Sequence, residues 1–186
     1  MPRRADERLE GRIVDAAYQI WSKGGEHALT MRAVATAAKT TTPTLYERFK
    51  DKHDLLKFLR TRARERMFAA VQPAKSARET CQLWLRFTQA HGNEYVLLTS
   101  NWAERRSRKE PMPSYEFLKT KLAQELGEDS EGHAWLPLAL VGLVHGTALL
   151  LLGEGVDAEV SRQFAEACLE ACEVLIEGAR DARRRR

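Results

Sequence analysis

Residues 30–52 constrain the fold of this chain more than any other stretch. They hold two short segments, 31–38 and 43–49, whose apolar residues recur at helical spacing on either side of a tight polar turn. The residues that would face inward are Val34, Ala35, Ala38, Leu45 and Phe49. Small alanines allow a close approach, so the spacing predicts two short helices packed against each other across the turn.

The second of these helices has a clear start. Thr42 offers a hydroxyl that can cap free backbone amides, and Pro43 fits the first helical position, where no N–H is needed. The outward side chains are short hydrogen-bonding groups, a phenol and a guanidinium: Thr41, Thr42, Thr44, Tyr46 and Arg48. A helix with this surface suits a polar, anionic partner, which favours a DNA recognition helix.

Charge is unevenly distributed along the 186 residues. Residues 1–75 carry 16 Lys and Arg against 9 Asp and Glu, whereas residues 76–186 carry 14 against 17. The balance is +7 in the first part and −3 in the second. The two-helix segment therefore lies in the basic part, as expected of a domain that faces phosphates.

A known family shares the motif of this segment. The motif is Thr42-Pro43-Thr44-Leu45-Tyr46, followed by Phe49 and Asp51-Lys52. These residues resemble the helix-turn-helix of tetracycline-repressor-type (TetR) transcriptional regulators, and the resemblance covers about residues 8–55. It implies an all-α fold with a three-helix DNA-binding domain, residues 1–52, and a helical effector-binding and dimerisation domain, residues 53–186.

The resemblance also implies a function. The implied function is that of a ligand-responsive transcriptional repressor. The repressor would bind a palindromic double-stranded operator as a homodimer, and a small apolar or aromatic effector would release it. The positions that match phosphate contacts are Thr30, Thr44, Tyr46 and Lys52. The positions that approach bases are Arg32, Thr41, Thr42 and Pro43, and Arg48 fits either role. Arg32 is the best candidate for guanine, since a guanidinium can bond O6 and N7 together.

The turn between the two helices departs from the family pattern. Family members usually have Gly-Val where this chain has Lys39-Thr40. Glycine accepts a left-handed backbone at little cost, whereas lysine pays some strain. We therefore expect a slightly altered turn, with an added positive charge beside DNA.

The rest of the chain shows helical spacing between clear breakers and no strand pattern. We predict about nine helices: 6–23, 31–38, 43–49, 51–71, 75–91, 94–107, 114–127, 133–152 and 157–180. Asp51 is expected to cap the fourth helix, which links the two halves. The basic stretch 105–109 is expected to be an exposed helix end, either solvated or against an anionic partner, and the run 183–186 a disordered tail.

The last two predicted helices suggest an interface between subunits. The first is apolar on all sides, and the second has near-heptad spacing at Val160, Phe164, Ala167, Ala171, Leu175 and Gly178. This pattern fits half of an intersubunit four-helix bundle, or else the core of a monomer. The TetR resemblance favours the dimer. Pro137, His145 and acidic flanks oppose a membrane span, so we expect none.

We expect a small-molecule pocket in the C-terminal part, largely because of the resemblance. The candidate lining residues are Trp84, Phe87, His91, Trp102, Tyr115, Trp135 and His145. Aromatic walls with a few polar groups are usual in ligand sites, but each of these residues also fits an ordinary core position.

The cysteines leave two further readings open. Cys81, Cys168 and Cys172 fit neither a zinc site nor a secreted disulfide framework, and the N-terminus lacks the apolar core of a signal peptide. We therefore expect a cytoplasmic protein with no metal or cofactor. A thiol- or metal-responsive regulator using Cys168 and Cys172 is an alternative, as is an architectural DNA binder without a ligand.

An enzyme built on a helical bundle is the alternative from another class. The sequence has no dinucleotide-binding, phosphate-loop, metalloprotease or di-iron motif, which favours a protein that is not an enzyme.

Overall fold

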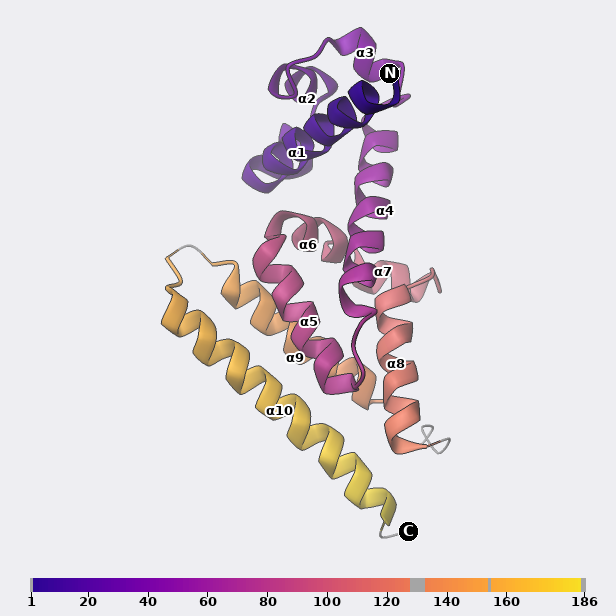
Figure 1. The fold of residues 1–186 in the computed structure, drawn as a ribbon, viewed down its shortest axis with the longest axis vertical. Helices are drawn as coiled ribbons and strands as arrows, with labels where there is room; N and C mark the ends of the chain where they lie inside the picture. The colour runs from indigo at the N-terminus through magenta and orange to yellow at the C-terminus, as the bar shows by residue number, and fades with distance from the viewer. Residues whose placement is uncertain (1, 128–132, 154, 185–186) are drawn as a thin grey trace. The chain divides into compact units, whose positions relative to one another are not determined.

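The regular structure of this chain is helical (Figure 1). The computed structural model describes residues 2–127, 133–153 and 155–184, and within these ranges it contains ten helices and no strand. The helices are α1 (Pro2–Ala28), α2 (Met31–Ala37), α3 (Thr42–Tyr46), α4 (Lys52–Val71), α5 (Ala77–Ala90), α6 (Gly92–Thr99), α7 (Trp102–Ser107), α8 (Pro113–Leu126), α9 (Leu136–Leu151) and α10 (Ala158–Arg184). The predicted all-α fold with an N-terminal helix-turn-helix is confirmed.

The chain forms two compact units. The first comprises Met1–Ala63 and Asn93–Trp102, and the second comprises Arg64–Gly92 and Ala103–Arg186. Helix α4 belongs to the first unit up to Ala63 and to the second from Arg64 onward. The domain boundary after residue 52 stays a prediction, because compactness alone does not define the part of the chain that binds DNA.

The core of the first unit joins α1, α2, α3 and the start of α4. Its fully buried members include Ile13, Ala17, Leu29, Val34, Leu45, Leu55 and Leu59. The five residues predicted to face inward in the helix-turn-helix are all buried there. The phenol of Tyr18 adds a polar tie by donating to the Leu59 carbonyl oxygen at 2.8 Å. A small apolar core of this kind fixes the orientation of α2 and α3 within the unit.

Helix α1 is broken near its end, close to residue 23, where the first helix was predicted to end. Gly25 has φ 62° and ψ −156°, a conformation that side chains other than glycine rarely adopt. One further turn follows and ends at Ala28. A break is therefore present close to the predicted end, although the helical segment continues to Ala28.

The start of α4 is capped as predicted. The Asp51 carboxylate accepts a hydrogen bond from the Asp54 backbone N–H at 2.8 Å. The Asp54 carboxylate reaches back to accept one from the Lys50 N–H at 3.1 Å. This reciprocal pair satisfies two amides that the helix itself leaves free.

Residues 94–107, predicted as one helix, form two. Helix α6 ends at Thr99 and α7 begins at Trp102. The hydroxyls of Thr99 and Ser100 donate to the carbonyl oxygens of Tyr95, at 2.8 Å, and Leu97, at 2.9 Å. Such side-chain bonds compete with the backbone ladder, so the single-helix prediction was wrong at this point.

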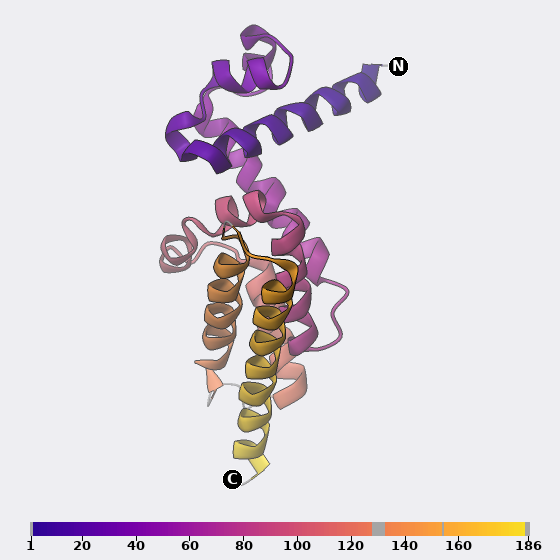
Figure 2. The ribbon, with the colours of Figure 1, turned by 90° about the vertical axis from the view of Figure 1, so that its left-hand side faces the viewer.

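The second unit is built around α5, α8, α9 and α10. Helices α9 and α10 lie side by side, and α5 packs against both (Figures 1 and 2). Helix α10 contributes Cys168, Cys172, Ile176 and Ala179 to the buried face. It continues to Arg184, so the predicted tail at 183–186 begins as helix, and residues 185–186 lie outside the described part. Residues 128–132, between the helices predicted at 114–127 and 133–152, and residue 154 also lie outside it.

The long apolar stretch at 134–152 falls largely in α9. In the described part of the chain, no helix combines the length and the apolar character that a membrane crossing requires.

Candidate DNA-binding surface and ligand cavity

Two threonines cap the two short helices of the helix-turn-helix. Thr30 precedes α2, and its hydroxyl accepts a hydrogen bond from the Ala33 N–H at 3.1 Å. Thr41 precedes α3 in an extended conformation, and its hydroxyl accepts from the Thr44 N–H at 3.3 Å. The cap is therefore Thr41 and not Thr42 as predicted, because only Thr41 lies three residues before the amide it satisfies. Pro43 accordingly occupies the second helical position.

Lys39 closes the turn between α2 and α3 in the left-handed region, with φ 53°. The Lys39 N–H donates to the Thr36 carbonyl at 3.1 Å, and the Thr40 N–H donates to the Ala35 carbonyl at 2.9 Å. These two bonds form the standard Schellman closure of a helix. Lysine thus adopts the conformation that glycine would adopt more cheaply, and the turn keeps its regular hydrogen bonds.

Arg12 supports this turn from α1. Its Nε donates to the Ala38 carbonyl oxygen at 3.1 Å, 26 residues away in sequence. Arg12 carries no sequence signal for this role, because no local pattern links it to the end of α2.

The residues predicted to contact DNA are accessible to different degrees. Those that are exposed are Thr30, Arg32, Thr41, Pro43 and Tyr46; those that are half-buried are Thr42, Thr44, Arg48 and Lys52. Tyr46 has 52% of its surface exposed. Among the described residues of the first unit, it is the exposed large hydrophobic side chain. Leu45 beside it is fully buried and anchors α3 in the core.

The cations of this surface differ in their partners. Arg32 is exposed and has no ion pair among the described residues. The Lys52 ammonium donates to the Glu26 carbonyl oxygen at 3.2 Å and lies 3.9 Å from the Glu26 carboxylate. An ammonium carries three donors, so Lys52 keeps N–H groups for a further acceptor.

The residues predicted to line a pocket differ in their burial. Trp84, Phe87 and Tyr115 are buried, whereas Trp102 and His145 are half-buried. Trp135, just before α9, is 51% exposed. Phe87 and His91 do lie together, with ring centroids 5.0 Å apart, and the His91 ring is also 3.3 Å from the Arg66 guanidinium.

Burial affects two of these side chains in particular. Desolvation lowers the pKa of His145 below its ordinary value. The indole N–H of Trp84 is buried and has no hydrogen-bond acceptor in the part of the chain that the structure describes.

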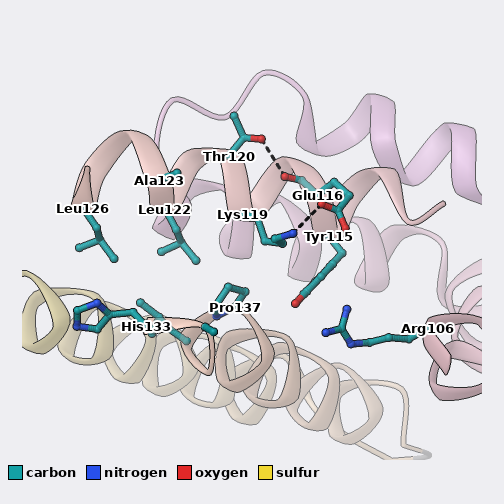
Figure 3. Close-up of a pocket in the computed structure, with 12 residues that line it drawn as sticks. Arg106, Tyr115, Glu116, Lys119, Thr120, Leu122, Ala123, Leu126, His133 and Pro137 are labelled. Carbon is teal, nitrogen blue, oxygen red and sulfur yellow. Dashed lines mark hydrogen bonds and ion pairs between the residues drawn. The ribbon is translucent and has the colours of Figure 1, made fainter. Parts of the chain in front are cut away.

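A cavity of about 480 Å³ lies between α8, the segment leading into α9, and the end of α7 (Figure 3). Its lining residues are Arg106, Tyr115, Glu116, Lys119, Thr120, Leu122, Ala123, Leu126, His133, Ala134, Leu136 and Pro137. Of the seven predicted pocket residues, Tyr115 is the one found in this lining. Arg106 belongs to the basic stretch 105–109, for which an anionic partner was one of the two expectations. No local sequence pattern links the remaining lining residues, which come together only in the folded chain.

Three thiols occupy the packed region between α5 and α10. Cys81, Cys168 and Cys172 are all buried and free. A hydrogen bond to Cys172, together with burial, raises the pKa of Cys168 well above its usual range. For Cys172 a hydrogen bond with Cys168 lowers the pKa, but one with Cys81 and burial raise it, to about 12 overall. Such thiols stay protonated at neutral pH, which disfavours the thiol-sensing alternative.

The metal-sensing alternative also lacks support from the geometry. Within residues 2–127, 133–153 and 155–184, no group of three or more His, Cys, Asp or Glu side chains is arranged to hold a metal ion.

Comparison with known proteins places this helix-turn-helix in a family. Residues 13–59 match the model of bacterial regulatory proteins of the tetR family. No curated protein is significantly similar to the chain.

Solved structures extend the likeness to the whole fold. A TetR-like transcriptional regulator from Rhodococcus sp. RHA1 superposes with a TM-score of 0.70 at 21% identity, over 90% of this chain and 93% of that one. The TetR-family regulator PfmR from Thermus thermophilus gives a TM-score of 0.63 at 17% identity, over 86% and 97% of the two chains. Residues 13–59 thus carry the helix-turn-helix of the tetR family, and the fold of the chain is similar to that of these TetR-family regulators.

Proposed function

We propose that this regulator is a repressor that binds a palindromic operator as a homodimer and is released by a small apolar or aromatic effector. The observation that carries this proposal is the surface of α3, where Leu45 is fully buried while Tyr46 is half exposed. A helix held so firmly on one side can present its other side to the major groove without rearrangement. Occupation of promoter DNA by such a dimer excludes polymerase from the same stretch.

The proposed phosphate contacts are Thr30, Thr44, Tyr46 and Lys52. The exposed Thr30 hydroxyl and the first amides of α2 are suited to one phosphate oxygen. The proposed base contacts are Arg32, Thr41, Thr42 and Pro43, with Arg48 in either role. Arg32 supports a guanine contact, because its guanidinium is exposed and forms no ion pair with any described residue.

The proposal of a homodimer rests on the surface of α9 and α10. Six large hydrophobic side chains are exposed on these helices or just before α9: Trp135, Leu138, Leu149, Leu150, Phe164 and Val174. Gly142 and Gly146 on α9 are exposed, and a methyl group added at either would meet open space. Apolar faces with small residues favour close packing against the same two helices of a second copy.

Two-fold symmetry then sets the DNA geometry. The recognition helices of such a dimer stand roughly 34–36 Å apart, one turn of DNA, and so select an inverted repeat. An effector can favour a dimer in which the recognition helices stand at a different distance from each other. Such an effector lowers operator affinity by the ratio of its affinities for that dimer and for the DNA-binding dimer. Helix α4 is the natural element for this coupling, because it belongs to both compact units.

The effector is proposed to bind in the second unit, at residues drawn from the predicted aromatic set. Tyr115 supports this, since it lines a cavity of ligand size. The protein would act without enzymatic turnover, in the bacterial cytoplasm where its operator lies.

A pair of Tyr46 variants tests the DNA-binding part of the proposal. We expect Tyr46→Ala to weaken binding to duplex DNA about tenfold or more, measured by fluorescence anisotropy, because a phosphate hydrogen bond and its positioning are lost. Tyr46→Phe removes only the hydroxyl and should account for most of that loss. Unchanged affinity in both variants, with unchanged thermal unfolding, would contradict the proposed role of α3.

A further inference from the structure

The cavity in the second unit has two chemically different ends. Its volume of about 480 Å³ falls in the range of small-molecule sites. One end is lined by charged groups from α7 and α8, and the other by leucines of α8 and residues leading into α9 (Figure 3). A ligand that filled it would therefore need a polar head and an apolar body.

Arg106 supplies the unbalanced charge at the polar end. Its guanidinium carbon lies 4.9 Å from the centroid of the Tyr115 ring, a cation–π distance that holds the side chain over the ring. No carboxylate pairs with Arg106 among the described residues. Lys119 stands 5.8 Å from the same ring, but its ammonium is bonded to the Glu116 carboxylate at 3.0 Å. The Lys119 and Glu116 charges cancel, and Arg106 leaves this end positive.

The opposite end offers apolar surface, with one buried polar atom beside it. Leu122, Leu126 and Pro137 face the space between α8 and α9 (Figure 3). The His133 Nδ1 atom is buried there without a hydrogen-bond partner in the described part of the chain. A flat ring or short hydrocarbon body would cover these side chains and remove their apolar area from water.

We infer that this cavity binds a small organic anion, a carboxylate attached to a flat apolar body, with Arg106 as its anchor. A guanidinium presents parallel N–H donors that match the two oxygens of a carboxylate, which makes the pairing stronger than a bond to a neutral group. A cationic ligand of the same shape would be repelled by the Arg106 charge. Glu116 would not offset this repulsion, because its carboxylate is already paired with Lys119. The assignment of this anion as the effector rests on the proposed function.

Three naphthalene compounds of nearly equal shape test the ligand class on purified, DNA-free protein. They are 2-naphthoate, 2-naphthylmethylammonium and 2-naphthalenemethanol, with affinities measured by isothermal titration calorimetry. We expect the anion to bind about tenfold or more tightly than the cation, with the alcohol between them. Equal binding of anion and cation, or no binding of the anion to folded protein, overturns the inference.

Variants then locate the site. Arg106→Gln should lower 2-naphthoate affinity about tenfold and change the affinity for the alcohol by less than about twofold. Arg108→Gln is the matched control, since Arg108 is exposed, pairs with Glu104 at 2.7 Å and does not line the cavity. Ala123→Phe should abolish binding of all three compounds by filling the space. Anion binding that is insensitive to both Arg106→Gln and Ala123→Phe overturns the assignment of the site.

A final arm separates this inference from the proposed function. Saturating 2-naphthoate should weaken binding to a selected operator in the wild type but not in Arg106→Gln. Failure to bind DNA in the absence of 2-naphthoate counts against the proposed function and leaves the ligand measurements standing. If saturating 2-naphthoate leaves the operator affinity unchanged, the assignment of the anion as effector is overturned, and the assignment of the anion site is not affected.

Discussion

The Tyr18 hydroxyl in α1 donates a 2.8 Å hydrogen bond to the Leu59 carbonyl in α4, across 41 residues of sequence and inside the core of the first unit. This bond joins the helix that supports the helix-turn-helix to the helix that follows it. We expect Tyr18→Phe to lower the free energy of unfolding by about 1 kcal/mol, since a buried hydrogen bond is lost while the ring stays. Urea unfolding followed by circular dichroism measures this, and an unchanged or higher free energy of unfolding would count against a stabilising bond.

We expect substitution of Lys39 by glycine to raise stability and to lower DNA affinity. Lys39→Gly should raise the free energy of unfolding by about 0.5–1 kcal/mol, because glycine adopts the left-handed turn with less strain. The same change removes a positive charge from the turn before α3, so it should weaken DNA binding for all sequences and flatten the salt dependence of the affinity.

Lys109 provides the matched control for this prediction. It has φ 55° and closes the end of α7 with the same pair of backbone bonds, from Lys109 N to Arg106 O and from Glu110 N to Arg105 O. Lys109→Gly should therefore stabilise the protein to a similar extent without changing DNA affinity. An equal loss of DNA affinity in both variants would show that the charge of Lys39 has no local role.

Val174 tests the dimer surface. It is 68% exposed on α10, so Val174→Glu should fold normally. A buried, unpaired charge at a helix interface should raise the dimer dissociation constant at least about tenfold. Light scattering coupled to size-exclusion chromatography measures the mass, with Glu177→Gln on the same helix as control. A wild type that is monomeric at all concentrations, or a variant that dimerises as well as the wild type, contradicts the proposed interface.

His145 should make stability depend on pH. Burial lowers its pKa in the folded protein, so the unfolded chain binds the proton more tightly. Its contribution to stability is fully present above the unfolded pKa, about 6.5, and is lost as the pH falls through the lower folded pKa. Below about pH 6 the wild type should thus lose stability more steeply than His145→Gln. Parallel urea titrations with the same pH slope for both proteins would refute this.

The sequence predicted the helix-turn-helix well because its determinants are local. The Asp51 cap, the break at Gly25 and the inward face of Leu45 each depend on residues a few positions apart. One helix was predicted over 94–107 where two are present, because apolar spacing does not reveal the hydroxyl bonds of Thr99 and Ser100 to the backbone.

The cavity could not be predicted in the same way. Arg106, Lys119 and His133 come from three different segments, and only packing brings them to one space. The aromatic residues chosen for a pocket were selected by type, and Trp84 and Phe87 are buried in a helix without lining this cavity. The spacing of aromatic residues along one helix does not show which face of that helix lines a cavity.

We propose that α3 reads a symmetric operator, and selection of bound sites from random duplex DNA by the purified protein is the decisive experiment. We expect enrichment of an inverted repeat whose half-sites lie about one helical turn, roughly 10 base pairs, apart. The same selection with Tyr46→Ala should give much weaker enrichment. No enriched sequence with the wild type, or an enriched site without two-fold symmetry, would contradict binding of a symmetric operator by α3.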